Sequence, residues 1–222
     1  MQSLNFNQLW RYQDHLIEGL ITTLQLTAIS TVVGVAIGVL GAMVLRYGAA
    51  PFRAVVAGYV GLFRNTPSLI QLFVVFFVLP DLGLKLPAFV AAAVALSLYF
   101  GAYATEIVRA GLDSVPRSQV EAGQCLGLTR WQVYRHVIMP PALYNVLPSF
   151  SSQFALLLLG TSLASQISVE DLFHAGSFIE SRTYRSFEVY AVICAIYLAL
   201  VLVSKAVFAL LGRLAFNWPM RR

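Results

Sequence analysis

The 222-residue chain is 59% apolar and only 11% charged, whereas an ordinary soluble domain carries about 25% charged residues. This composition excludes a disordered chain and argues against a soluble domain, because 15 Lys plus Arg and 10 Asp plus Glu are too few to cover its surface. The net charge of +5 is spread thinly along the chain, which favours an oriented membrane protein and no nucleic-acid partner.

Five long stretches with few or no charges predict an all-α integral membrane protein with five transmembrane helices, since about 20 apolar residues span the hydrocarbon core. The second stretch contains Arg64 and Pro67. Because the part after Pro67 is too short to cross alone, we expect one continuous span. The third is free of charge from Pro87 to Thr105 and its helix is expected to reach Arg109. The predicted spans are residues 20–45, 54–79, 87–109, 142–169 and 189–211 of a single domain, 1–222.

Small residues recur on one face of the first two spans. Gly34, Gly38 and Gly41 share a face of the first, and Gly58 and Gly61 follow at a similar spacing in the second. Such faces allow helices to approach closely, so we expect packing here and no chemistry.

The cations predict the orientation of the chain. With the amino terminus outside, most Lys and Arg residues fall on the inner side, as the positive-inside rule requires, and the carboxyl terminus is also inside. The inner cations would be Arg46, Arg53, Arg109, Arg117, Arg130, Arg135, Lys205, Arg213, Arg221 and Arg222, and the outer ones Arg11, Lys85, Arg182 and Arg185.

Two predicted loops are long enough to fold. The outer one, from Glu170 to Glu188, is expected to carry a short helix that caps the bundle. The inner one, residues 110–141, lies between spans three and four and is neither low in complexity nor strongly charged. Within it, Ser118 to Glu121 form a capping box that predicts a helix from about Gln119, closed by Gly127 in the left-handed conformation.

A second capping box, Thr129 to Gln132, predicts another helix in the inner loop. Its apolar face would be Trp131, Tyr134 and Ile138, held against the inner membrane surface, and Pro140 and Pro141 would end it. A DNA-reading helix pair is the less favoured interpretation, because short tethers to two spans would keep it out of a groove.

Six segments carry a resemblance to a known family. They are residues 63–67 (FRNTP), 102–111 (AYATEIVRAG), 114–116 (SVP), 121–129 (EAGQCLGLT), 137–140 (VIMP) and 161–165 (TSLAS). The segments at 121–129 and 137–140 resemble the cytoplasmic "EAA" loop of ABC importer permeases. The other segments are similar to those of the polar-amino-acid uptake branch, which includes histidine, glutamine and glutamate permeases, and the likeness extends over residues 20–212.

The resemblance implies the membrane-spanning permease subunit of an ATP-driven ABC importer. Such a subunit translocates polar amino acids, delivered by a solute-binding protein, across the bacterial inner membrane. A permease for another small solute, such as an opine or an amino-acid derivative, is the alternative. An ATP-independent channel or secondary transporter is less favoured, because five unequal spans contain no inverted repeat. An intramembrane hydrolase would need a histidine within the spans, where the sequence has none.

The energy for transport would come from a partner. The two lysines follow Leu84 and Ser204, so the sequence contains no Gly-Lys-Ser/Thr phosphate loop. The resemblance implies two copies of an ATP-binding subunit, which would hold ATP and Mg, while no cofactor or metal is expected in this chain. The further partners it implies are a second permease, identical or related, the binding protein, the amino acid and the lipid bilayer.

The inner loop is implied to dock onto the ATP-binding subunit and to couple hydrolysis to transport. The expected coupling residues are Glu121, Ala122, Gly123, Leu126, Gly127, Leu128 and Thr129. Gly123 departs from the alanine usual in the family, which weakens the helix by about 1 kcal/mol. Leu159 and Gly160 stand where the family commonly has Lys-Asp, so the substrate class cannot be inferred from that pair.

Polar side chains inside the membrane are costly and so indicate the transport route. Arg64 and Glu106 are the charges well inside the predicted spans, and we expect an ion pair first and contact with the substrate zwitterion second. The polar face of span four is expected to line either the route or the seam between two permeases. The candidate pathway residues are Arg64, Asn65, Thr66, Gln71, Tyr99, Tyr103, Glu106, Gln153, Thr161, Ser162 and Gln166.

Overall fold

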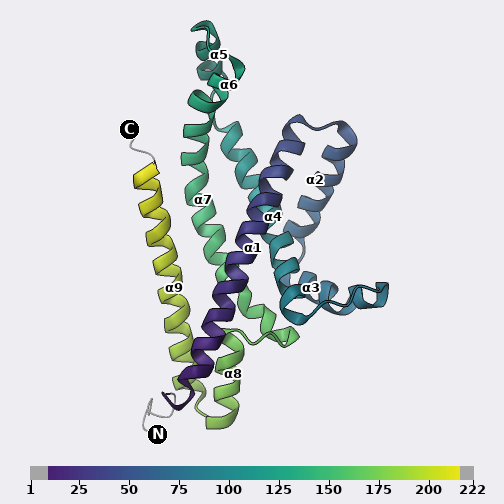
Figure 1. Ribbon diagram of the computed structural model, residues 1–222, viewed down its shortest axis with the longest axis vertical. Coiled ribbons are helices and arrows are strands. Elements are labelled where there is room, and N and C mark those ends of the chain that lie inside the picture. Colours follow the sequence, from purple (N-terminus) through teal and green to yellow (C-terminus); the bar gives the residue numbers. More distant parts are fainter. Residues whose placement is uncertain (1–9, 216–222) are drawn as a thin grey trace.

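The computed structural model describes residues 10–215, which form a bundle of long helices (Figure 1). Four helical runs are long and apolar enough to cross a membrane, and a bent pair is a fifth candidate. No β-strand occurs between residues 10 and 215, in agreement with the predicted all-helical membrane fold. The α-helices are α1 (Gln13–Tyr47), α2 (Ala50–Asn65), α3 (Ser68–Phe73), α4 (Ala88–Asp113), α5 (Arg117–Cys125), α6 (Arg130–Gln132), α7 (Met139–Gly160), α8 (Leu172–Thr183) and α9 (Ser186–Ala215).

Helices α1 and α4 form the most extensive contact in the bundle, and glycines on α1 make it possible. Gly34 lies against Phe100, and Gly38 and Gly41 lie against Ala104 and Thr105. The close approach expected on the first span is therefore confirmed. On α2, no described atom lies within 4 Å of a side chain built at Gly58 or Gly61, so no such contact is made there within this chain.

We expect Gly38→Ala to destabilise the bundle. The added methyl group would overlap Ala104 and lie 3.0 Å from the Thr105 nitrogen, so α1 and α4 must separate. Overpacking of this kind costs roughly 1–3 kcal/mol, which thermal unfolding of the purified protein in detergent would report as a lower midpoint. Gly58→Ala is the matched control, because its methyl group meets open space. Equal midpoints for the two variants would contradict the prediction.

The second span is bent, so the prediction of one continuous helix over 54–79 is wrong. The chain turns by 113° at the break between α2 and the helical stretch that begins with α3. Pro67 lacks an N–H and disfavours a helical residue before it, and Thr66 is accordingly extended, with φ −118° and ψ 147°. After α3 the chain continues through a π-helical segment, Val74–Val78, and a short 3₁₀ helix, Leu79–Leu82.

The fourth span differs in the opposite way. The prediction that Pro140 and Pro141 end a helix is wrong, because residues Arg130–Ile167 form one helical run of 38 residues. This run consists of α6, a π-helical segment Val133–Ile138, α7 and a 3₁₀ helix Thr161–Ile167. The prolines lie in the first turn of α7, where a missing N–H costs little. The predicted loop 110–141 is consequently too long, since α4 also extends to Asp113.

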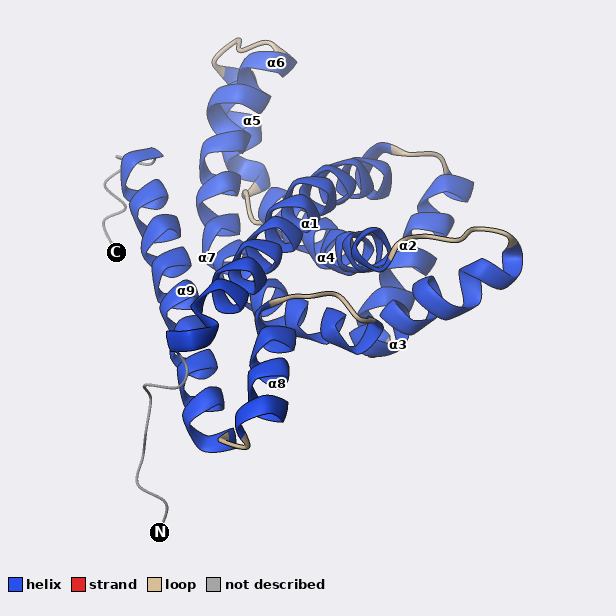
Figure 2. Cartoon of the chain, turned by 60° about the horizontal axis from the view of Figure 1, so that its bottom comes forward, coloured by secondary structure: helices blue, strands red, loops and turns tan. Residues whose placement is uncertain are grey.

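The end of the bundle away from α5 is closed by α8, the short helix expected between residues 170 and 188; Figure 2 shows it beside the start of α9. Asp171 caps α8 by accepting a hydrogen bond from the His174 N–H at 2.9 Å. The Leu172 N–H donates to the Thr23 hydroxyl of α1 at 3.1 Å. Asp171 is fully buried, and its carboxylate also lies 3.4 Å from the Tyr197 hydroxyl of α9. This capping group therefore joins α1, α8 and α9.

Stability at this end should depend on pH through Asp171. Burial raises the pKa of the Asp171 carboxyl from 3.8 to about 6, although the N–H of His174 and the hydroxyl of Tyr197 oppose the shift. Between these values the folded protein holds a proton that the unfolded chain releases. The resulting stabilisation, at most about 3 kcal/mol, is complete below pH ~4 and is lost as the pH rises through ~6.

Thermal unfolding measured from pH 5 to 8 tests this expectation. The midpoint of the unaltered protein should fall across this range. Asp171→Asn keeps the acceptor for the His174 N–H but cannot ionise, so its midpoint should fall less. The same pH dependence in both proteins would assign it to another group.

Candidate functional site

The loop between α4 and α7 begins with α5, which differs from the prediction at its start. The helix begins at Arg117, directly after Pro116, and no side chain caps it, so the predicted capping box of Ser118 and Glu121 is wrong. Pro116 sets the extended backbone that the capping residue needs, with φ −61° and ψ 139°, and Ser118 already lies inside the first turn. Glu121 is exposed.

The second half of the loop follows the prediction. Gly127 adopts the left-handed conformation, with φ +77°, and ends the turn after α5. The Thr129 hydroxyl accepts from the Gln132 N–H at 3.3 Å, and the Gln132 side chain accepts from the Thr129 N–H at 2.9 Å. The second capping box is therefore confirmed, and it fixes where α6 begins.

The two helices of the loop pack through small and branched residues. A side chain built at Gly123 would lie 3.4 Å from both Val133 and Val137, so a glycine here brings α5 close to the helical run of α7. Val133 is buried, whereas Trp131 is 65% exposed and stacks on Tyr134 with ring centroids 6.1 Å apart. Of the predicted apolar face, Trp131 and Tyr134 stack on each other, whereas Ile138 packs in one cluster with Leu112, Val115 and Val120.

Several predicted coupling residues lie on the open surface of this loop. Leu126 is 81% exposed, and Glu121, Ala122 and Thr129 are also exposed. Leu128 is half-buried. We call the exposed surface formed by Glu121, Ala122, Leu126, Thr129 and Trp131 the loop tip. An exposed leucine and tryptophan beside a carboxylate suit contact with another protein.

A cluster of charges lies where α1, α2 and α4 meet below the loop. The expected ion pair between Arg64 and Glu106 is present, with 3.5 Å between Arg64 Nη1 and Glu106 Oε2. Glu106 also accepts from Arg109 Nε at 3.0 Å and Nη2 at 2.8 Å. Arg46 and Arg109 both reach Asp113, at 2.8 and 3.3 Å. We refer to these five residues as the charge cluster.

Arg109 and Asp113 were not among the predicted site residues. Arg109 was expected only at the inner end of the third span, as a cation that orients the chain. The missed signal was the spacing along α4: Glu106, Arg109 and Asp113 follow one another at intervals of three and four, which places them on one helix face.

Aromatic side chains extend the charge cluster along α4. The Arg64 guanidinium lies 5.5 Å from the centre of the Tyr103 ring, within the range of a cation–π contact. The Tyr103 and Tyr99 rings lie 5.0 Å apart. Tyr99 in turn interacts with Gln153 of α7. Predicted pathway residues from α2, α4 and α7 are therefore brought together.

Three other predicted pathway residues hold the break between α2 and α3. The Gln71 amide nitrogen donates to the Phe63 carbonyl at 2.9 Å and to the Thr66 carbonyl and hydroxyl at 3.1 and 2.8 Å. The Asn65 amide donates to the Gly61 carbonyl at 2.7 Å, and the Thr66 hydroxyl to the Leu62 carbonyl at 2.8 Å. These side chains satisfy backbone groups at the end of α2.

The polar residues at the end of α7 are likewise bound locally. The hydroxyls of Thr161 and Ser162 each donate to a carbonyl one turn earlier, at 2.7 Å. Thr161 is fully buried, and Gln166 is exposed. Beside them, Leu159 is 43% exposed, and a side chain built at Gly160 meets nothing within 4 Å among the described residues.

Two buried amides have an atom without a well-formed hydrogen bond among the described residues. These atoms are Gln71 Oε1 and Gln153 Nε2; Gln153 interacts with Tyr99, but not with hydrogen-bond geometry, and the two residues are 8% and 6% exposed. An unpaired buried polar group costs roughly 1–3 kcal/mol. A polar solute that reached either atom would remove this penalty.

Comparison with known proteins gives a consistent result over most of the chain. A family model described as "Binding-protein-dependent transport system inner membrane component" matches residues 34–216. The L-cystine transport system permease protein TcyB of Bacillus subtilis (strain 168) is 39% identical over 74% of this chain and 70% of its own length. The glutamine transport system permease protein GlnP of Escherichia coli (strain K12) is 31% identical over 94% of this chain and 96% of its own length.

A solved structure agrees with these sequence matches. The crystal structure of an amino acid ABC transporter with histidines has a chain that is 35% identical, with a TM-score of 0.88. The likeness covers 96% of this chain and 99% of that one. The likeness therefore includes all the described helices and the loop between α4 and α7.

Proposed function

The chain belongs to the family of binding-protein-dependent transport system inner membrane components, and on this premise we propose that it imports polar amino acids as the permease subunit of an ABC transporter. The observation that carries the substrate class is the likeness, at 35% identity and a TM-score of 0.88, to a solved amino acid ABC transporter. The relatives named as cystine and glutamine permeases support the same class.

The loop tip is proposed to dock onto the ATP-binding subunit, so the loop end of the bundle faces the cytoplasm and the amino terminus lies outside. The cations near this end, such as Arg46, Arg109 and Arg117, support the orientation. Arg221 and Arg222, which also contributed to the orientation predicted from the sequence, lie outside the described residues. Two copies of the partner would hold ATP and Mg, and the membrane would be the bacterial inner membrane.

The proposed route for the solute follows the polar side chains shared by α2, α4 and α7. Tyr99, Tyr103 and Gln153 supply hydroxyl and amide groups in an otherwise apolar bundle, which is the usual design of a small-solute site. Gln71 would act mainly by holding the break of the second span. A single five-span unit leaves this face open, so a second permease, identical or related, would complete the route.

Glu106 and Arg64 have two possible roles along this route. The 2.8 and 3.0 Å contacts from Arg109 occupy both carboxylate oxygens of Glu106, which supports a structural ion pair. Arg64, at 3.5 Å, is held more loosely and is 42% exposed. We therefore propose that the cluster sets the relative positions of α2 and α4, with direct binding of the substrate carboxylate by Arg64 as the second possibility.

Another small solute, such as an opine or an amino-acid derivative, is the alternative substrate. Leu159 and Gly160 support this alternative substrate, because they leave an apolar, open surface where the family commonly has a charged pair. An ATP-independent channel is the less favoured mechanism.

Reconstitution with candidate partners tests the proposal. The chain is coexpressed with candidate ATP-binding subunits, and each purified complex is placed in liposomes. Amino acids and opines are then tested one by one, each in the presence of a solute-binding protein. ATP hydrolysis and uptake of the solute are measured for every combination. We expect stable copurification and stimulation by a polar amino acid. Uptake without ATP, or no complex with any ATP-binding subunit, would refute the proposed mechanism.

A further inference from the structure

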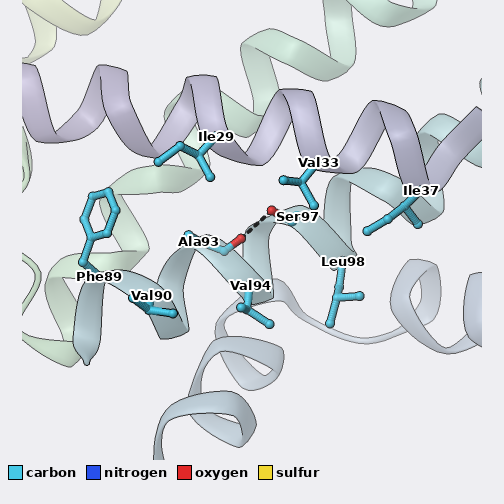
Figure 3. Close-up of a pocket in the computed structure, with 9 residues that line it drawn as sticks. All are labelled: Ile29, Val33, Ile37, Phe89, Val90, Ala93, Val94, Ser97 and Leu98. Carbon is cyan, nitrogen blue, oxygen red and sulfur yellow. Dashed lines mark hydrogen bonds between the residues drawn. The ribbon is translucent and has the colours of Figure 1, made fainter. Parts of the chain in front are cut away.

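An apolar groove runs along the outside of the bundle between α1 and α4 (Figure 3). Its volume is about 370 Å³. The Ser97 hydroxyl, the polar side chain in its wall, donates to the Ala93 carbonyl at 2.6 Å. The groove therefore suits a hydrocarbon occupant. The residues that line it are Ile29, Val33 and Ile37 of α1 and Phe89, Val90, Ala93, Val94, Ser97 and Leu98 of α4.

The groove lies on the side of α4 opposite the proposed solute route. Val90 and Tyr99 are nine residues apart, as are Val94 and Tyr103. Nine residues make about 2.5 turns of an α-helix, so the members of each pair point in opposite directions. A second permease that completes the route would meet the tyrosine face. The groove then faces the lipid.

The length of the groove matches one leaflet of a bilayer. Along α4 it extends from Phe89 to Leu98, which is about 14 Å at 1.5 Å per residue. Half of the hydrocarbon core is about 15 Å thick. Ile29, Val33 and Val90 are between 40 and 43% exposed, so the groove is open along its side to the membrane.

Two charged residues precede Phe89 in the connection that leads into α4. Lys85 is exposed and precedes Phe89 by four residues, in the connection that leads into α4. Asp81 is exposed earlier in the same connection. An ammonium group at the membrane surface is placed to meet a lipid phosphate, and an acyl chain of the same lipid would then extend along the groove.

We propose that the groove binds one acyl chain of a phospholipid whose phosphate lies beside Lys85. The proposal rests on the proposed function, because the second permease must lie on the opposite side of α4. It assigns to the outer leaflet a lipid that stays with the transporter and packs between α1 and α4.

Photolabelling of the intact transporter complex tests the lipid site. The probe is phosphatidylglycerol with a diazirine in the middle of one acyl chain, mixed into phosphatidylethanolamine proteoliposomes. We expect adducts on residues 29–37 and 89–98. Val33→Trp should fill the groove and reduce them by about tenfold. Val32→Trp is the matched control, because Val32 is 71% exposed on the neighbouring face of α1 and does not line the groove.

Unchanged labelling of Val33→Trp would overturn the lipid site, as would disulfide formation between two copies carrying Val33→Cys. Lys85→Ala should weaken labelling by the phosphatidylglycerol probe but not by a diacylglycerol with the same diazirine chain; equal effects on both would remove the phosphate contact. Unfolding midpoints of both tryptophan variants show whether they fold. Amino-acid-stimulated ATP hydrolysis is measured separately, so failure of the lipid site and failure of the proposed function are distinguishable.

Discussion

Glu106→Gln is expected to reduce amino-acid uptake by about tenfold or more while the chain still reaches the membrane. The substitution removes the negative charge shared by Arg64 and Arg109, whose guanidinium groups lie 3.5 and 2.8 Å from it. Breaking a fully buried ion pair costs about 3–5 kcal/mol. Glu106 is 24% exposed, so a smaller loss is expected, and about 1.4 kcal/mol already corresponds to a tenfold change. Uptake into proteoliposomes at matched protein amounts measures the effect.

The control for this variant is Asp113→Asn. Asp113 also binds Arg109, but it is 52% exposed at the end of α4, and exposed pairs contribute little. A paired variant, Glu106→Gln with Arg109→Gln, separates the two roles of Glu106. If the carboxylate acts by balancing charge, the paired variant should recover much of the lost uptake. If it contacts the substrate ammonium group, uptake stays low. Full uptake by Glu106→Gln alone would refute both roles.

Glu121→Arg should reduce ATP-driven uptake by about tenfold or more, as expected when a charge within a protein–protein interface is reversed. The structure makes this a clean test. Glu121 is exposed and does not cap α5, so its replacement leaves the loop intact. The loss would then report on the partner surface. Copurification of the ATP-binding subunit and uptake are measured together.

Gln119→Arg is the matched control for the docking surface. Gln119 is also exposed on α5, but it is two residues away and so points in another direction. It adds a positive charge to the same helix without removing Glu121. Equal losses in both variants would indicate a general charge effect, and normal coupling in Glu121→Arg would exclude this carboxylate from docking.

The approximate positions of four of the five predicted spans could be read from the sequence, because uncharged runs report directly on the membrane. The prolines could not be interpreted in the same way. Pro67 breaks its span because Thr66 is extended and Gln71 satisfies the freed carbonyl groups. Pro140 and Pro141 leave theirs intact because they lie in the first turn after a π-helical segment. The difference depends on neighbouring side chains and backbone geometry, which no local pattern in the sequence contains.

In the candidate site, too, some features could be predicted from the sequence and others could not. Arg64 and Glu106 could be paired from the sequence because isolated charges in a membrane need partners. The loop motif identified Gly127 and the capping box at Thr129. The chemistry of Gln71 was beyond sequence reasoning, since its contact with the Phe63 carbonyl exists only after the chain has turned by 113°.

The continuous helical run from Arg130 to Ile167 makes the fourth span a lever arm. At 1.5 Å per residue its 38 residues extend about 57 Å. A tilt of ~10° at the loop tip would therefore displace the opposite end by ~10 Å, far more than the length of a hydrogen bond. Pro140 and Pro141 do not interrupt this run, which also contains Pro148 inside α7. A small movement of a docked partner would then produce a larger displacement of Gln166. The helical run itself would carry this movement, without a chain of intermediate side-chain contacts.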